Sequence, residues 1–190
     1  AAAKLLLHRG YPVVLYDGNG KQGREDILAK APALKDAEIV LGELPDAVME
    51  GCSIAVLSPG VPTDLAEVGR MRELGLQIWG EIELAYIFEQ GTILAVTGTN
   101  GKTTTTALLG EIMKHAVSKV QVVGNIGIPY TGVVEKTDAQ SVTVAEISSF
   151  QLETVHSFCP QISAILNITP DHLNRHHTME NYCEAKMRIA

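Results

Sequence analysis

The sequence predicts an α/β protein with two parallel-sheet parts, the second of which opens on a phosphate-binding loop. Short apolar runs alternate with polar or helical stretches, which is typical of parallel sheets built from strand–helix units. A glycine-rich turn with a lysine follows one apolar run at residues 93–106, ILAVTGTNGKTTTT. We expect a boundary at Gln90–Gly91, with a Rossmann-like domain over residues 1–90 and a P-loop domain over residues 91–190.

The first part is expected to begin within a helix that ends near Arg9, with Gly10 just beyond it. A Rossmann-like fold places a strand and a glycine-rich turn before such a helix, so we expect the first strand to be missing and the chain to be a fragment. The expected strands are Val13–Tyr16, Glu38–Leu41, Ser53–Leu57 and Leu76–Trp79, and the expected helices lie near Gly23–Lys30, Thr63–Leu74 and Glu81–Glu89.

The second part is expected to contain four more strands and two long helices. One helix follows the phosphate loop, and the other is still running at the last residue, as in a chain cut within its domain. The strands are Ile93–Thr97, Val120–Val123, Val142–Ile147 and Ile162–Ile168, and the helices are Lys102–His115 and Met179–Ala190.

The loop between the first of these strands and its helix has the composition of a triphosphate site. Glycines free backbone N–H groups to point at phosphate oxygens, Lys102 adds a positive charge at the β/γ position, and the Thr103 hydroxyl can hold Mg²⁺. The spacing departs from a strict Walker A motif, and an ordinary helix start is the alternative. The preceding strand and the hydroxyl run favour phosphate binding, with contacts from Gly98, Thr99, Asn100, Gly101, Lys102, Thr103 and Thr104.

Two other strands of the second part end in polar residues. One ends in Glu146, followed by Ser148, and another ends in Asn167, followed by His172. Ligands collect at the carboxyl ends of parallel strands, and carboxylate and hydroxyl oxygens suit Mg²⁺. Glu146 could instead cap the following turn, and His172 could be a surface histidine. Structural zinc is disfavoured for His172, His176, His177 and Cys183, because no Cys-x-x-Cys pair accompanies them.

Lys186 lies on the apolar face of the last helix, together with Tyr182 and Ile189. A lysine that points inward is costly without a partner or a role. Its stem could be buried while its ammonium stays in water. A buried, uncharged amine could instead react with CO₂, and the carbamate would supply anionic oxygens to a metal. The pattern alone leaves both open.

Composition excludes several classes of protein. A net charge of −7 without a basic patch argues against a nucleic-acid binder, and no apolar run is long enough to span a bilayer. No signal peptide is recognisable at the start of the chain. Three scattered cysteines favour reduced thiols in the cytoplasm over a disulfide framework.

Five motifs together resemble the Mur ligases of peptidoglycan precursor synthesis. They are GTNGKTTTT, GNIG at 124–127, EISSFQLE at 146–153, NITPDHLNRH at 167–176 and NYCEAKMRI at 181–189. EISSFQLE is most similar to the branch that adds D-glutamate. SPGVP at 58–62 and GEIEL at 80–84 are weaker matches. The resemblance implies a first domain for the UDP part of the substrate, a central ATPase domain and an acceptor domain, of which this chain holds most of the first and part of the second.

The resemblance also implies a reaction. ATP hydrolysis drives amide formation: the carboxylate of UDP-N-acetylmuramoyl-L-alanine attacks the γ-phosphate, and the amine of D-glutamate then displaces phosphate from the acyl phosphate. Mg²⁺ is the implied metal, in a cytoplasmic, monomeric enzyme of cell-wall biogenesis and cell division. We expect the fragment alone to be inactive. A P-loop NTPase that drives a conformational change and a non-catalytic nucleotide-sugar binding module are the alternatives.

Carried over by position, the family's roles fall on these residues. Lys102 would stabilise the γ-phosphate, Thr103 and Glu146 would hold one Mg²⁺, and His172 would hold a second. Lys186 would be the carbamylated lysine, which resolves its two alternatives in favour of the carbamate. The implied substrate contacts are Asp17, Gly60, Asn125 and Ser148. Two departures weaken the match: Asn174 replaces the usual Asp, and Gly18-Asn19 replace a basic residue near the sugar nucleotide.

Overall fold

The structure is a computed structural model that describes all 190 residues. The chain divides into two compact units, residues 1–55 with 64–78 and residues 56–63 with 79–190. The expected boundary at Gln90–Gly91 lies inside the second unit, because helix α5 (Glu81–Phe88) packs on elements of that unit. The assignment of residues 1–90 to a UDP-substrate domain stays a prediction.

The first unit is built around a parallel pair of strands, β1 (Val14–Asp17) and β2 (Glu38–Leu41), with Val14 opposite Glu38. Its helices are α1 (Ala2–His8), α2 (Arg24–Lys30), α3 (Asp46–Glu50) and α4 (Ala66–Glu73), with a 3₁₀ turn at Pro32–Leu34. Gly10 has a φ of +80°, and the N–H groups of Gly10 and Tyr11 close the end of α1 on the Leu7 and Leu6 carbonyls. This Schellman arrangement confirms the expected helix end.

Strands β3 (Ile54–Leu57) and β4 (Gln77–Gly80) form a separate two-stranded sheet. Residues 54, 55, 77 and 78 belong to the first unit, whereas residues 56, 57, 79 and 80 belong to the second. The chain therefore passes between the units along both strands.

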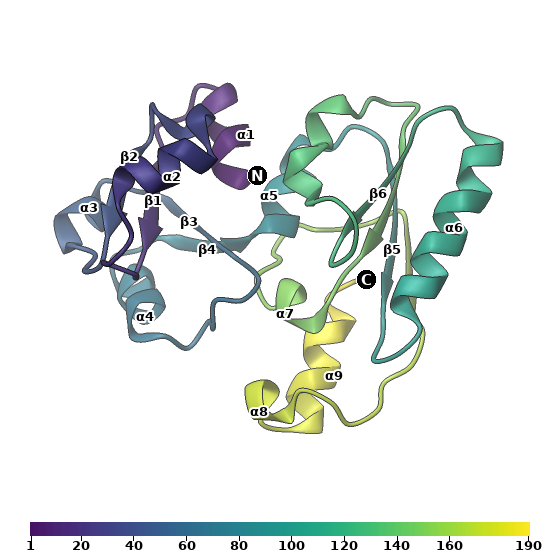
Figure 1. Cartoon of the computed structure of the whole chain (residues 1–190). Helices are drawn as coiled ribbons and strands as arrows, with labels where there is room; N and C mark the ends of the chain where they lie inside the picture. Colours follow the sequence, from purple (N-terminus) through teal and green to yellow (C-terminus); the bar gives the residue numbers. More distant parts are fainter. The chain divides into compact units, whose positions relative to one another are not determined.

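The second unit holds a four-stranded, fully parallel sheet in the order β6-β7-β5-β8. Figure 1 shows α6 along one side of this sheet and α5, α7 and α9 on the other side. The strands are β5 (Thr92–Thr97), β6 (Val120–Gly124), β7 (Val142–Glu146) and β8 (Ile162–Ile165); the remaining helices are α6 (Lys102–Ala116), α7 (Ser149–Leu152), α8 (Leu173–His176) and α9 (Met179–Met187), with 3₁₀ turns at Tyr130–Gly132 and Val134–Lys136.

The apolar core of the second unit explains why β5 and β7 read as continuous hydrophobic runs. Both strands are central and covered on both faces, so nearly every residue is buried. Leu94, Val142 and Val144 pack against Leu109 and Met113 of α6. The sheet confirms the predicted α/β class with parallel strands. No helix in the chain is both long and apolar enough to cross a membrane.

Three elements are at least three residues shorter than expected. Helix α9 ends at Met187, with Arg188 as its C-cap, so the expectation that it is still running at Ala190 is wrong. The other two differences have a local cause. Strand β8 ends at Ile165 rather than Ile168, because Asn167 turns to bind the loop that follows β5. Helix α4 begins at Ala66 rather than Thr63, whose hydroxyl donates to Glu153 in the second unit.

Candidate nucleotide and metal site

The ends of three neighbouring strands form the site. β5 lies between β7 and β8, and all three run in parallel, so their carboxyl ends share one edge of the sheet. Val96 of β5 is paired with Glu146, and Thr97 is paired with Ile165. The sequence expected these three ends to meet if the strands were adjacent, and the sheet order makes them adjacent.

The loop between β5 and α6 needs its glycines. Gly98 and Gly101 have φ values of +152° and +82°, which L side chains rarely adopt. A Cβ atom on Gly98 would also lie 3.1 Å from the Cβ of Leu166. Helix α6 begins at Lys102 without a side-chain cap. Its first N–H groups therefore have no intrahelical partner and point, with the positive end of the helix dipole, toward the space where an anion can bind.

A clamp from the segment after β8 fixes the loop. Asn100 N–H donates to the Asn167 side chain at 2.9 Å, and the Asn167 amide donates back to the Asn100 carbonyl at 3.0 Å. Thr169 N–H donates to the Thr99 hydroxyl at 3.0 Å, and that hydroxyl also lies 3.0 Å from the Tyr182 hydroxyl. The backbone geometry that phosphate binding requires is therefore held before any ligand arrives.

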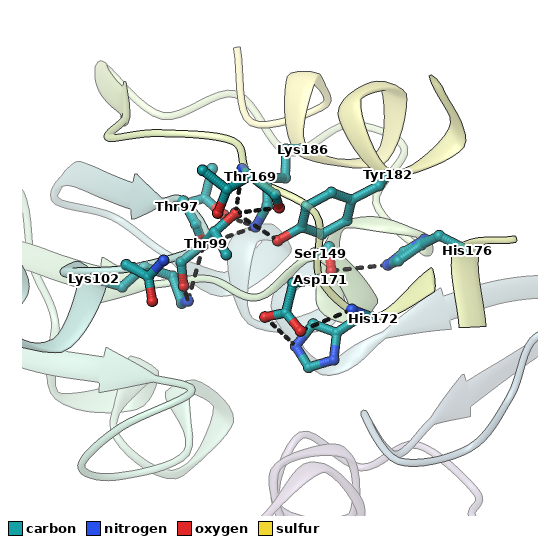
Figure 2. Close-up of polar contacts among 12 residues, drawn as sticks. Thr97, Thr99, Lys102, Ser149, Thr169, Asp171, His172, His176, Tyr182 and Lys186 are labelled. Carbon is teal, nitrogen blue, oxygen red and sulfur yellow. Dashed lines mark hydrogen bonds and ion pairs between the residues drawn. The ribbon is translucent and has the colours of Figure 1, made fainter. Parts of the chain in front are cut away.

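Two lysines converge on the loop (Figure 2). The Lys102 ammonium donates to the carbonyls of Gly98 and Thr99, both at 2.9 Å. The Lys186 ammonium reaches the same Gly98 carbonyl at 2.9 Å from α9, and it lies 4.7 Å from the centre of the Tyr182 ring. A positive pair beside a glycine-rich loop is suited to polyphosphate.

Lys186 is only 1% exposed, so the alternative of a buried stem with a solvated ammonium is wrong. Burial, followed by the positive charge of Lys102, lowers the pKa of Lys186 to about 8. A larger fraction of this amine is therefore neutral near physiological pH than for an ordinary lysine. The neutral amine is the nucleophilic form that carbamate formation requires.

Glu146 is the second buried charged residue at this edge, with 1% exposure. Its Oε1 accepts a bond from the Asn125 amide at 2.8 Å, whereas its Oε2 is buried without a partner. The alternative that Glu146 caps the next turn is wrong, because the Ser148 side chain caps α7. A buried carboxylate oxygen without a hydrogen bond is costly, and a cation would offset that cost.

His172 precedes α8 in a left-handed conformation, with a φ of +53°. Its ring lies 4.9 Å from the Phe150 ring and 3.5 Å from the Asp171 carboxylate, and its side chain is 48% exposed. His172 follows Thr169 by three residues, and Thr169 binds Thr99 of the phosphate loop. The segment that carries His172 therefore begins at that loop. Figure 2 shows the Asp171 carboxylate beside the His172 ring and, in the same view, Lys102 beside Thr99.

The donor set fits Mg²⁺ bound together with phosphates rather than a protein-only metal cage. No group of three or more His, Cys, Asp or Glu side chains converges to hold a metal ion. Mg²⁺ usually takes one or two protein ligands and completes its shell with water and phosphate oxygens. The partnerless Oε2 of Glu146 is the observation that favours a cation here.

The four expected substrate contacts are divided between the units. Asn125 and Ser148 lie beside Glu146 at the sheet edge, and Gly60 lies in an exposed turn of the second unit. Asp17 ends β1 in the first unit, where it accepts a bond from Asn19 N–H at 2.8 Å. Sequence reasoning missed the clamp role of Tyr182 and Asn167, although an asparagine directly after a buried strand was an available signal.

Residues 96–190, half of the chain, match the family described as the Mur ligase middle domain. This chain belongs to the Mur ligase family. It is similar to two curated proteins called UDP-N-acetylmuramoylalanine–D-glutamate ligase, with 54% identity to that of Lachnoclostridium phytofermentans and 55% to that of Lachnospira eligens. Both matches cover the whole chain and 42% of the relative, so this Mur ligase chain spans about two fifths of the relatives' length.

A solved structure supports the fold of this Mur ligase. The crystal structure of UDP-N-acetylmuramate:L-alanyl-gamma-D-glutamyl-meso-diaminopimelate ligase (MPL) from Neisseria meningitides matches with a TM-score of 0.52 and 14% identity. The match covers 99% of this chain and 62% of that one. At this identity, the likeness concerns the fold alone.

Proposed function

We propose that the chain is part of an ATP-dependent ligase that adds D-glutamate to UDP-N-acetylmuramoyl-L-alanine in peptidoglycan precursor synthesis. The observation that carries the proposal is a buried carboxylate oxygen of Glu146 without a partner, at the strand end beside the phosphate loop. A bound cation would stabilise the buried Glu146 carboxylate. A Mg²⁺ ion held there would complete its shell with oxygens of the phosphates that the loop can bind. Relatives with more than 50% identity carry the name of the D-glutamate enzyme.

The residues would divide the work by charge. Lys102 would leave the loop carbonyls to neutralise the γ-phosphate as the substrate carboxylate attacks it. The bond between the γ-phosphorus and the bridging oxygen would break, which gives the acyl phosphate and ADP as the leaving group. Thr103 and Glu146 would hold one Mg²⁺, and His172 with carbamylated Lys186 would hold another. When bound, the metal ions neutralise charge on the transferring phosphoryl oxygens. Asp17, Gly60, Asn125 and Ser148 would bind the UDP-substrate.

The amine of D-glutamate would then displace phosphate from the acyl phosphate. The chain covers 42% of its relatives, and we place the D-glutamate site in the part of the ligase that they have in addition. The 190 residues alone would therefore make no amide. We also propose that the complete ligase acts as a cytoplasmic monomer.

Phosphate release from the complete protein tests the proposal. ATP and UDP-N-acetylmuramoyl-L-alanine are supplied with D-glutamate, lysine, diaminopimelate or D-Ala-D-Ala as acceptor. Release that needs the UDP-substrate and is strongest with D-glutamate is expected. ATP turnover without the UDP-substrate would indicate an NTPase, and UDP-substrate binding without turnover would indicate a binding module. Preference for another acceptor would reject the D-glutamate assignment.

A further inference from the structure

Glu153, at the end of α7, joins four segments of the second unit that are far apart in the sequence. Its Oε2 accepts bonds from Arg175 at 2.6 Å and from the Thr63 hydroxyl at 3.2 Å. Its Oε1 lies 3.5 Å from the His176 ring, and its backbone carbonyl accepts from Arg188 at 3.0 Å. The side chains of Glu153 and Arg175 are 15% and 16% exposed, so this is a largely desolvated ion pair.

Arg175 extends the pair to the turn at residues 58–61. The same guanidinium nitrogen that binds Glu153 also donates to the Val61 carbonyl at 3.3 Å. Val61 N–H closes the turn on the Ser58 carbonyl at 2.9 Å. The turn is thus tied to α7 from one side through Thr63 and from the other through Arg175.

Little free space separates the turn from α7. The cavity between Ser58, Pro59, Val61, Phe150 and Gln151 has a volume of about 10 Å³. That volume holds at most about one water molecule. The turn is tied to this end of α7 by the bond of Thr63 to Glu153 and by the bonds of Arg175 to Glu153 and to the Val61 carbonyl.

The same arginine also supports His172. Its guanidinium carbon lies 5.0 Å from the centre of the Phe150 ring, and that ring is 4.9 Å from the His172 ring. The backbone N–H of Arg175 also donates to the His172 carbonyl at 2.9 Å. One side chain therefore connects the backbone that carries Gly60 with the segment that carries His172.

We propose that Glu153 and Arg175 are positioning residues that hold the residue 58–61 turn in place for the UDP-substrate, against the same helix that supports His172. The inference rests on the proposed function, because it takes Gly60 as a substrate contact. Neither residue touches the reacting atoms. Their effect falls on binding of the UDP-substrate, whereas the clamp formed by Asn167 and Thr99 keeps the phosphate loop intact.

Steady-state kinetics of the complete ligase test the pair. Arg175→Lys keeps a positive charge, but its ammonium lies one bond nearer the backbone than the single guanidinium nitrogen that binds both Glu153 and the Val61 carbonyl. We therefore expect lysine to keep at most one of the two bonds and to lose the contact of the planar guanidinium with the Phe150 ring. We expect the KM for UDP-N-acetylmuramoyl-L-alanine to rise about tenfold, the loss of roughly one charge-assisted hydrogen bond. The KM for ATP stays within about twofold. Arg70→Lys is the matched control, because Arg70 pairs with Asp46 and Glu73 on the surface and does not contact the turn.

Hydrogen exchange supplies a readout that is independent of turnover. The amide of Val61 should exchange faster in Arg175→Lys and in Glu153→Gln, whereas the Thr99 and Asn100 amides keep the wild-type rate. Glu153→Gln replaces Arg175→Lys in the kinetics if the latter does not fold. Equal rises in both KM values, or an unchanged Val61 exchange rate, would overturn the proposal. An inactive wild-type ligase would instead reject the proposed function, while the exchange experiment would still decide whether the pair holds the turn.

Discussion

Two carboxylates end parallel strands in the two units, and their surroundings make them different. Asp17, at the end of β1, is exposed and accepts a bond from Asn19 two residues on. Glu146, at the end of β7, is 1% exposed and keeps one oxygen without a partner. Water can hydrogen-bond to the Asp17 carboxylate at little cost. Burial of the Glu146 carboxylate costs free energy that a bound cation would offset. A carboxylate at a strand end becomes a candidate metal ligand only when the fold takes water away from it.

The largest effect is expected at the loop beside Glu146. Lys102→Met in the complete ligase removes the charge proposed to face the γ-phosphate, and kcat should fall by about 10³-fold, in the range of other phosphoryl-transfer cations. The rate of phosphate release at saturating ATP measures this change in kcat. A fall below about tenfold would mean that Lys102 is not at the reacting phosphate.

Matched amide substitutions test the comparison directly. Glu146→Gln should lower kcat by about 10²-fold and raise the Mg²⁺ concentration needed for half-maximal activity, because a neutral amide is a poor Mg²⁺ ligand. Mg²⁺ titrations of the activity of the wild type and of Glu146→Gln check the result. If the Mg²⁺ requirement does not change, Glu146 is not a ligand.

Lys186→Met separates function from stability. The pKa of Lys186 is about 8 in the folded protein against an ordinary value of 10.5, so the folded state binds fewer protons between these values. Stability from this group therefore rises with pH across that window and is lowest below pH 8. Without CO₂, Lys186→Met should be more stable than the wild type by about 1–3 kcal/mol at pH 7.

The difference should shrink as the pH rises from about 8 and should be smallest above pH 10.5, where the wild-type amine is neutral in both the folded and the unfolded state. Thermal unfolding midpoints at several pH values measure the difference. A difference that does not vary with pH would mean that methionine packing, not the buried charge, is responsible.

The smallest effect is expected at Asp17. Asp17→Asn should raise the KM for the UDP-substrate by less than about tenfold, because an exposed hydrogen bond contributes little. The KM for ATP and the Mg²⁺ requirement should not change. A loss of kcat as large as that of Glu146→Gln would remove the distinction between the two carboxylates.

Much of the architecture was predictable, because each strand of the second unit is a short, largely apolar run, and polar residues stand at or just after the ends of β5, β7 and β8. The inward-facing position of Lys186, with Tyr182 and Ile189, was also predictable, but the pattern did not decide between a solvated and a buried ammonium, and the structure shows that it is buried. The partnerless oxygen of Glu146 was not, because it depends on which neighbours fail to reach it. The Glu153–Arg175 pair was equally hidden, since 22 residues separate its members and no local pattern joins them. The early end of β8 followed from the side-chain bonds of Asn167 rather than from strand propensity.

The carbonyl of Gly98 accepts from both Lys102 and Lys186. Two like charges that share one peptide oxygen repel each other, and the charge of Lys102 is, after burial, the second cause of the lowered pKa of Lys186. As long as Lys186 is not carbamylated, an anionic chain laid between them would convert this repulsion into attraction on both sides. Affinity for such a ligand should then fall steeply as ionic strength rises, and even small inorganic anions should compete for the same place.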